Sequence, residues 1–136
     1  MKLLALAAVF LGLTGANGPT LTLTCKSAAT AICDQTGCHS VTPSITVYVG
    51  TFLGEKGSRE SYYTRCDASG CDSYVPTVAF SGAYTLFSLP TRGVMAKVGP
   101  GDNLVDVASL MDTVYINRAT CVSEPPPILR TVSHKN

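Results

Sequence analysis

The most regularly spaced reactive side chains in this 136-residue sequence are its six cysteines, which either bind a metal ion or form disulfides. Zinc sites favour closely spaced Cys pairs with further Cys or His at matching offsets. Here the close pairs are separated by four residues, and the chain has only two His. A predicted export signal precedes all six cysteines, and an even number of Cys in an exported protein is typical of a disulfide framework. We therefore predict three disulfides, no metal and no cofactor.

Two segments, beginning at Cys33 and at Cys66, repeat the pattern Cys-Asp-x-Ser/Thr-Gly-Cys at an offset of 33 residues. An Asp after the first Cys accepts a hydrogen bond from the backbone ahead of it, and a Gly before the second Cys permits a positive φ. The chain thus reverses and brings the two sulfurs of each motif together. We interpret both motifs as disulfide-pinned hairpin turns, and a pair of equivalent binding tips is the alternative. The predicted disulfides are Cys33–Cys38, Cys66–Cys71 and, from the two remaining cysteines, Cys25–Cys121.

Groups able to catalyse hydrolysis are sparse. Nucleophilic catalysis needs a nucleophile, a base and an orienting group, yet the only His residues are His39, in the first turn motif, and His134, near the C-terminus. The sequence contains no G-x-S-x-G, H-E-x-x-H or phosphate-binding Gly motif. We therefore expect no enzyme, and keep a small secreted hydrolase as an alternative. A pair of carboxylates can cleave a glycosidic bond, and two such pairs flank predicted turns: Asp67 with Asp72 and Asp102 with Asp106. Turn formation and solvation explain all four residues without an active site.

One loop has the composition of a recognition element: Ser81-Gly82-Ala83 is followed by Tyr84, and Arg92-Gly-Val-Met-Ala lies downstream. These motifs resemble the periplasmic inhibitors of C-type lysozyme, small exported β-barrels with an S-G-A-x-Y loop and a later K-G-x-x-A strand. In that family the loop Ser and Tyr enter the lysozyme cleft and meet its catalytic carboxylates. The resemblance implies binding through Ser81, Gly82, Ala83, Tyr84 and Arg92. Here the Tyr comes one residue earlier, Arg replaces Lys, and the match covers under a fifth of the chain.

The elements that must position these residues are short β-strands. Polar and apolar residues alternate in several β-branched and aromatic runs, which Gly, Pro, Asn and Asp separate. This pattern predicts an all-β fold, a small antiparallel barrel or sandwich of about 7–8 short strands stapled by three disulfides. An Ala-rich stretch over residues 27–32 predicts one helical turn. The sets expected to face the core are Ile45/Val47/Val49, Val94/Ala96/Val98 and Val114/Ile116.

The chain divides into three predicted segments. Residues 1–16 read as a cleaved signal peptide, because Lys2 precedes a continuous apolar run that ends in small residues. Residues 17–122 form a single disulfide-stabilised β domain that contains the repeat. Residues 123–136 contain three consecutive prolines near their start, at positions 125–127, and are expected to be a flexible tail. The apolar run of the predicted signal is too short to span a membrane as a helix, and no longer apolar run follows it.

Charge limits the class of partner. Lys2 lies in the predicted signal, so nine basic and nine acidic side chains remain in the mature chain and no run of like charges is present. Nucleic-acid binding normally needs a basic stripe, so we expect none. We predict a secreted or periplasmic, non-catalytic binding or inhibitor module for an extracytoplasmic protein or glycan, with a lysozyme inhibitor as its sharpest version. A structural surface protein that self-associates is the alternative, and the oligomeric state stays open.

Overall fold

The computed structural model describes residue 18 and residues 20–124, and within them the chain is almost entirely β-strand. The all-β prediction is confirmed, and the only helix in this part is a 3-10 turn, η1 (Pro90–Arg92). Ten strands replace the expected 7–8, because each Cys motif is followed by its own return strand. The strands are β1 (Leu21–Asp34), β2 (Gly37–Val41), β3 (Thr46–Leu53), β4 (Arg59–Asp67), β5 (Gly70–Tyr74), β6 (Thr77–Ser81), β7 (Tyr84–Leu89), β8 (Val94–Gly99), β9 (Asn103–Leu110) and β10 (Thr113–Ser123).

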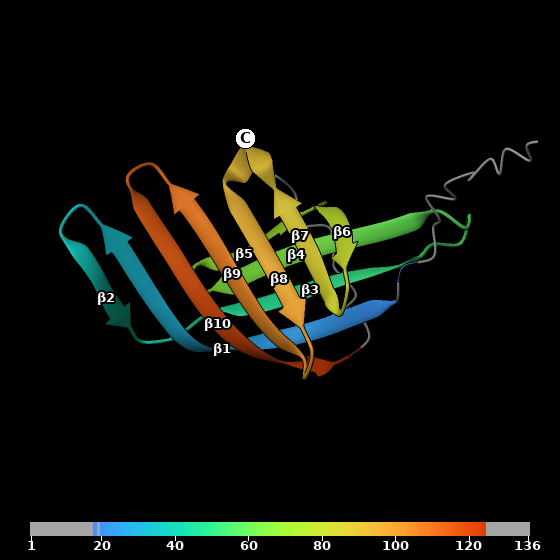
Figure 1. Cartoon of the computed structure of the whole chain (residues 1–136), viewed down its shortest axis with the longest axis horizontal. Coiled ribbons are helices and arrows are strands. Elements are labelled where there is room, and N and C mark those ends of the chain that lie inside the picture. The colour runs from blue at the N-terminus through green and yellow to red at the C-terminus, as the bar shows by residue number, and fades with distance from the viewer. Residues whose placement is uncertain (1–17, 19, 125–136) are drawn as a thin grey trace, which may run out of the picture.

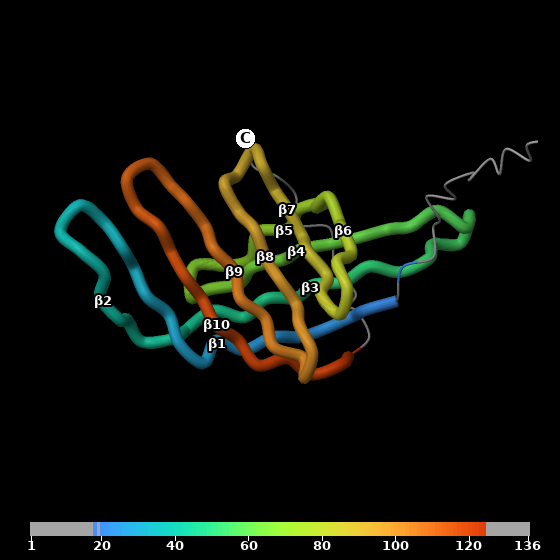
Figure 2. Tube along the Cα trace, viewed as in Figure 1, coloured from blue at the N-terminus to red at the C-terminus, as the bar shows by residue number. Residues whose placement is uncertain are grey.

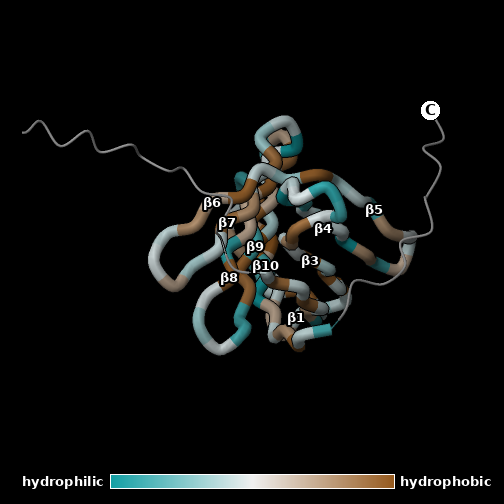
Figure 3. The backbone as a smooth tube through the Cα atoms, turned by 90° about the vertical axis from the view of Figure 1, so that its right-hand side faces the viewer, coloured by the Kyte–Doolittle hydropathy of each residue, from teal (hydrophilic) through white to brown (hydrophobic). Residues whose placement is uncertain are grey.

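All strands are antiparallel and form one sheet in the order β5-β4-β3-β1-β10-β9-β8-β7-β6. Strand β1 is long enough to serve two partners on one side, since residues 21–26 pair with β3 and residues 30–34 pair with β2. Its other side pairs with β10. The sheet curls about the β1–β10 pair into a half-barrel, so β3–β5 lie behind β7–β9 in Figure 1 and form the opposite layer in Figure 3.

A β-bulge at Ala28 divides β1 into two halves whose side chains alternate in opposite phase. Ser27 and Ala29 pair with consecutive residues of β10 and leave Ala28 without a partner. Odd-numbered residues such as Cys25 therefore face the concave side before the bulge, and even-numbered residues such as Thr30 face it afterwards. The predicted helical turn over residues 27–32 is wrong, because this segment continues the strand and pairs with β10.

Both layers of the half-barrel contribute to an apolar core on the concave side. Two of the three expected inward sets lie there: Val47, Val49, Ala96 and Val98 are buried, and Ile45 and Val94 pack against the core. The other buried members are Leu23, Cys25, Tyr63, Phe87, Leu89, Leu104, Ala119 and Cys121.

The third expected set, Val114 and Ile116, is wrong. On β10 the concave face carries Asn117, Ala119 and Cys121, all buried, and successive side chains of a strand point to opposite faces. Val114 and Ile116 therefore lie on the convex face and are half-buried there. Both faces of this strand carry apolar residues, so alternation alone does not reveal which face is inward.

Three disulfides join the predicted pairs Cys25–Cys121, Cys33–Cys38 and Cys66–Cys71. In each pair the two residues are directly opposite on neighbouring strands, with Cα atoms 3.9–4.0 Å apart. The bond between Cys25 and Cys121 joins β1 to β10 at the base of the half-barrel, whereas the other two each close a hairpin.

The strand β10 ends at Ser123, one residue beyond the predicted domain boundary, and the Glu124 N–H donates to the Thr22 carbonyl at 3.2 Å. The predicted signal peptide over residues 1–16 lies outside the described residues, as does the predicted tail from residue 125 onwards. The described part of the chain contains no apolar helix of membrane-spanning length.

Candidate functional site

Ser81, Gly82, Ala83 and Tyr84 form the exposed tip of the β6–β7 hairpin. Ser81 pairs with Tyr84, so the loop between the strands has two residues, and Gly82 takes a positive φ of 59° at its first position. A two-residue loop with Gly first is typical of a type II′ turn, whose twist matches that of the flanking strands. The tip is therefore a short, convex and ordered element.

Two aromatic rings at this hairpin lie against cations. The ammonium of Lys97 on β8 is 3.9 Å from the centroid of the Tyr84 ring, which also lies over the backbone of Gly99. The guanidinium of Arg59 on β4 is 5.5 Å from the centroid of Phe80. Tyr84 is 41% exposed and Phe80 is 40% exposed. Each ring is thus in contact with the rest of the protein and still partly exposed.

Arg92, the fifth predicted binding residue, lies at the opposite end of β7 from the tip. It ends η1, which follows β7, and a six-residue strand spans roughly 17 Å. Gly93 after it has a φ of 61°, and a Cβ built there would be 2.5 Å from the Ser109 carbonyl oxygen, so this turn requires glycine. The structure therefore does not bring Arg92 to Ser81–Tyr84, and Lys97 is the cation beside that tip.

Arg92 instead lines a cleft at the open end of the half-barrel, which we call the β5 cleft. Its guanidinium lies 5.3 Å from the centroid of the Tyr74 ring. The cleft has a volume of about 170 Å³ and separates β4 and β5 from η1, β8 and β9. A second cleft of about 220 Å³, between β1, β2, β4 and β10, shares Arg65 with it. The β5 cleft is lined by Tyr63, Arg65, Asp72, Tyr74, Arg92, Val94, Ala108 and Leu110.

A buried hydrogen bond lies at the floor of this cleft and joins the two layers. The Tyr63 hydroxyl donates to Oδ2 of Asp106 at 2.6 Å, and both side chains are almost fully buried. Burial, followed by the charge of Asp106 and this hydrogen bond, raises the pKa of Tyr63. The sequence predicts a solvated turn residue at Asp106, but the structure buries this side chain. Asp106 does not face Asp102, which is exposed in the β8–β9 turn.

Asn117, opposite Asp106 on β10, adds to this buried polar group. Its Oδ1 accepts hydrogen bonds from the hydroxyls of Ser27 at 2.7 Å and Thr30 at 3.2 Å. Its Nδ2 has no hydrogen-bond partner among the described residues. The bulge in β1 is what turns Thr30 toward Asn117, so the polar group depends on that irregularity.

The two Cys motifs form equivalent turns. Oδ1 of Asp34 accepts hydrogen bonds from the hydroxyl and N–H of Thr36, and Oδ1 of Asp67 accepts the same two bonds from Ser69. These bonds, from the hydroxyl first and the N–H second, lower the pKa of each carboxyl. Figure 2 shows both turns apart from the Ser81–Tyr84 tip, so the three do not form one surface.

The first of these turns contacts the neighbouring β9–β10 turn, because Nε2 of Gln35 donates to Asp112 at 3.3 Å. His39 lies on β2 and Asp72 on β5, which are not neighbours in the sheet. The His of the first turn motif and this carboxylate of the second are therefore placed on two separate hairpins.

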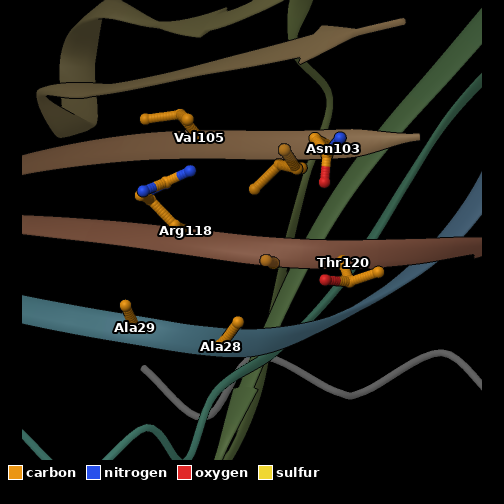
Figure 4. A pocket seen from close by; sticks show the side chains of 8 residues that line it. Ala28, Ala29, Asn103, Val105, Arg118 and Thr120 are labelled. Carbon is orange, nitrogen blue, oxygen red and sulfur yellow. The ribbon is translucent and has the colours of Figure 1, made fainter. Parts of the chain in front are cut away.

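A shallow hollow of about 240 Å³ lies on the convex face beside the bulge (Figure 4). The small side chains of Ala28 and Ala29 on β1 leave this space, and Arg118 on β10 and Val105 on β9 reach over it. Arg118 is its only charged lining residue. The hollow is a consequence of the bulge, and its walls offer few polar groups to a ligand.

Sequence reasoning identified the hairpin tip but missed the β5 cleft. A signal was present, since Tyr63 and Arg65 alternate on one strand, and Asp72 and Tyr74 alternate on the next. Those four side chains face the same side because Tyr63 pairs with Tyr74 and Arg65 pairs with Asp72. These side chains lie close to Arg92 only because the sheet curls, and a local sequence pattern does not predict that curl.

Comparison with protein-family models, with curated proteins and with solved structures gives no match to this chain. The functional argument therefore depends on the geometry of the tip and of the β5 cleft.

Proposed function

We propose that this protein is an exported, non-catalytic binding or inhibitor module that engages an extracytoplasmic protein or glycan through the tip Ser81–Tyr84. The observation that carries the proposal is the form of the tip, which presents four consecutive exposed residues at the end of a two-residue hairpin loop. A convex element of this kind fits a recess on a partner. Three disulfides and the predicted signal support export to an oxidising compartment.

The order within the tip supports binding without a large entropic cost. Pairing of Ser81 with Tyr84 fixes the loop, and Lys97 and Gly99 hold the Tyr84 ring before any partner arrives. A preorganised loop loses little conformational freedom on binding, so more of the contact energy appears as affinity. Tyr suits this role because its ring supplies apolar area and its hydroxyl makes a hydrogen bond.

Inhibition of C-type lysozyme is the sharpest form of this proposal, supported by the resemblance of the Ser81-Gly-Ala tip to the inhibitor loop. In this form the Ser81 and Tyr84 hydroxyls would enter the lysozyme cleft. Since Arg92 lies at the other end of β7, the cation available to a carboxylate near the tip is Lys97.

The test is a lysozyme assay with the processed, disulfide-bonded protein. We expect inhibition at micromolar excess, and we expect Tyr84→Ala or Ser81→Ala to weaken it at least tenfold. Met111→Ala is the matched control, because Met111 is fully exposed in the β9–β10 turn and should leave inhibition unchanged. Absence of inhibition by the parent protein at micromolar excess would remove the lysozyme form. Equal potency of the tip variants would remove the tip as the binding element.

A further inference from the structure

The β5 cleft has features of a second binding site that the proposed function does not use. It lies at the other end of β7 from the tip, where β5 faces η1 and the start of β8 across the mouth of the half-barrel. Its β4–β5 side carries two tyrosines, Arg65 and the carboxylate of Asp72, and its other side carries Arg92 followed by three aliphatic side chains. Each of these features restricts the chemistry of a ligand.

The charge of the cleft favours an anionic group beside Arg92. Asp72 is the partner of Arg65 across the β4–β5 pair, so this carboxylate offsets one of the two arginine charges that line the cleft. Arg92 lies over the Tyr74 ring, and no ion pair with a carboxylate is found for it in the described part of the chain. A guanidinium that lies over a ring keeps its in-plane N–H groups free to bind a carboxylate.

The wall of the cleft that β8 and β9 form beside Arg92 is aliphatic. It consists of Val94, Ala108 and Leu110, and the side chain of Leu110 is 55% exposed. The volume of about 170 Å³ is below the range of roughly 300–1,000 Å³ that encloses a whole drug-sized ligand. The cleft therefore fits one small group that bears both a carboxylate and an aliphatic chain, with the rest of the ligand outside.

The free edge of β5 supplies a place for the rest of that ligand. β5 pairs with β4 only, so its other edge has no strand beside it in the described structure. The Cα atoms of Cys66 and Cys71 are 4.0 Å apart, close to the roughly 4.5 Å of a non-hydrogen-bonded antiparallel pair. Pair types alternate along the ladder, so the pair Thr64 with Ser73 is also of this type, and the Ser73 N–H points away from β4.

We propose that the β5 cleft binds the carboxyl-terminal end of an extended polypeptide. The peptide adds as a strand to the free edge of β5, where it accepts a hydrogen bond from the Ser73 N–H. Its terminal carboxylate meets Arg92, and an aliphatic last side chain packs against Val94 and Leu110. The aliphatic wall favours a peptide over an acidic sugar, whose ring presents polar hydroxyls to its surroundings.

The test uses a fluorescein-labelled hexapeptide with a C-terminal valine, measured by fluorescence anisotropy with the processed, disulfide-bonded protein. We expect micromolar binding, and at least tenfold weaker binding of the same peptide with a C-terminal amide. Arg92→Gln should weaken the acid peptide at least tenfold, whereas Arg118→Gln on the convex face is the charge-matched control and should leave its affinity unchanged.

A second variant tests the strand edge. Ser73→Pro removes an N–H that the β4–β5 ladder does not use, and it should abolish binding while circular dichroism shows an intact fold. If this variant fails to fold, the Arg92→Gln and amide comparisons decide the matter. Lack of binding at millimolar peptide, or equal affinity of acid and amide, would overturn the proposal.

Two further comparisons identify the ligand class and separate the two proposals. Displacement of the peptide by glucuronic acid as readily as by N-acetylvaline would assign the cleft to acidic sugars and overturn the peptide assignment. Tyr84→Ala should leave peptide binding unchanged, because the tip is at the other end of β7. A failure of lysozyme inhibition therefore does not affect this result, and loss of peptide binding does not affect the tip.

Discussion

Tyr63 shows how one buried side chain connects the two layers of the half-barrel. It extends from β4 to Asp106 on β9, and among the described residues its hydroxyl is the one side-chain donor to that carboxylate. A buried carboxylate is costly without a hydrogen-bond donor. The bond therefore stabilises the curl of the sheet, and the curl in turn forms the β5 cleft above it.

Tyr63→Phe should lower the free energy of unfolding by about 1–3 kcal/mol near neutral pH, because it leaves Asp106 buried without this donor. The variant should also change how steeply the free energy of unfolding falls at alkaline pH. Since burial and Asp106 raise the pKa of Tyr63, its contribution is fully present below the unfolded pKa of about 10 and is lost as the pH rises above it. Urea unfolding between pH 8 and 11 measures both effects.

Burial raises the pKa of Tyr62 in the same direction, so a smaller alkaline loss should persist in the Tyr63→Phe variant. If the free energy of unfolding falls equally steeply with pH in the parent and the variant above pH 10, Tyr63 does not stay protonated in the folded protein.

At the scale of the elements, the bulge in β1 decides which side chains reach the concave face. Before it, Cys25 faces the core, and after it Thr30 faces Asn117. A strand without the bulge would place one of these two sets on the convex side, because the side-chain period is two. One residue without a partner thus makes both the core disulfide and the buried polar group compatible with a single strand.

Deletion of Ala28 should therefore destabilise the protein by about 3 kcal/mol or more, or prevent folding, because it turns the second half of β1 to the other face. The substitution Ala28→Ser keeps the bulge at an exposed position, and its effect should be within about 0.5 kcal/mol. Urea denaturation of both variants measures the difference. A deletion variant as stable as the substitution would show that the register can slip without cost.

At the scale of the whole molecule, the three disulfides have different mechanical roles. The Cys25–Cys121 bond links residues 96 apart in sequence, whereas the other two link residues five apart. It also lies in the core at the pair of strands about which the sheet curls, while the small rings lie at hairpins near the surface. The long-range bond thus restricts the unfolded chain most strongly.

Removal of the Cys25–Cys121 bond by paired Cys→Ala substitutions should cost about 4–5 kcal/mol in the loop-entropy model. The same change at Cys33–Cys38 or at Cys66–Cys71 should cost roughly 2 kcal/mol, since each closes only a short ring. Denaturation of the three double variants under identical conditions gives the ranking. A small-ring variant that loses as much stability as the Cys25–Cys121 variant would contradict it.

The sequence by itself determined the features that depend on neighbouring residues. The Cys-Asp-x-Ser/Thr-Gly-Cys pattern predicted both small disulfide turns, because the Asp acceptor, the Gly and the two sulfurs all lie within six residues. Alternation predicted an all-β antiparallel fold, and Ser81-Gly-Ala predicted an exposed hairpin tip whose role in binding stays a prediction.

Only the tertiary structure decided the features that depend on long-range register. Apolar residues occur on both faces of β10, so the inward set was assigned wrongly, and the bulge that reverses the phase of β1 has no composition of its own. Arg92 was expected to act with Ser81, yet it lies with Tyr74, eighteen residues earlier in the chain. The physical reason is that curling a sheet brings together side chains from strands distant in sequence, and hydrophobic periodicity describes each strand separately.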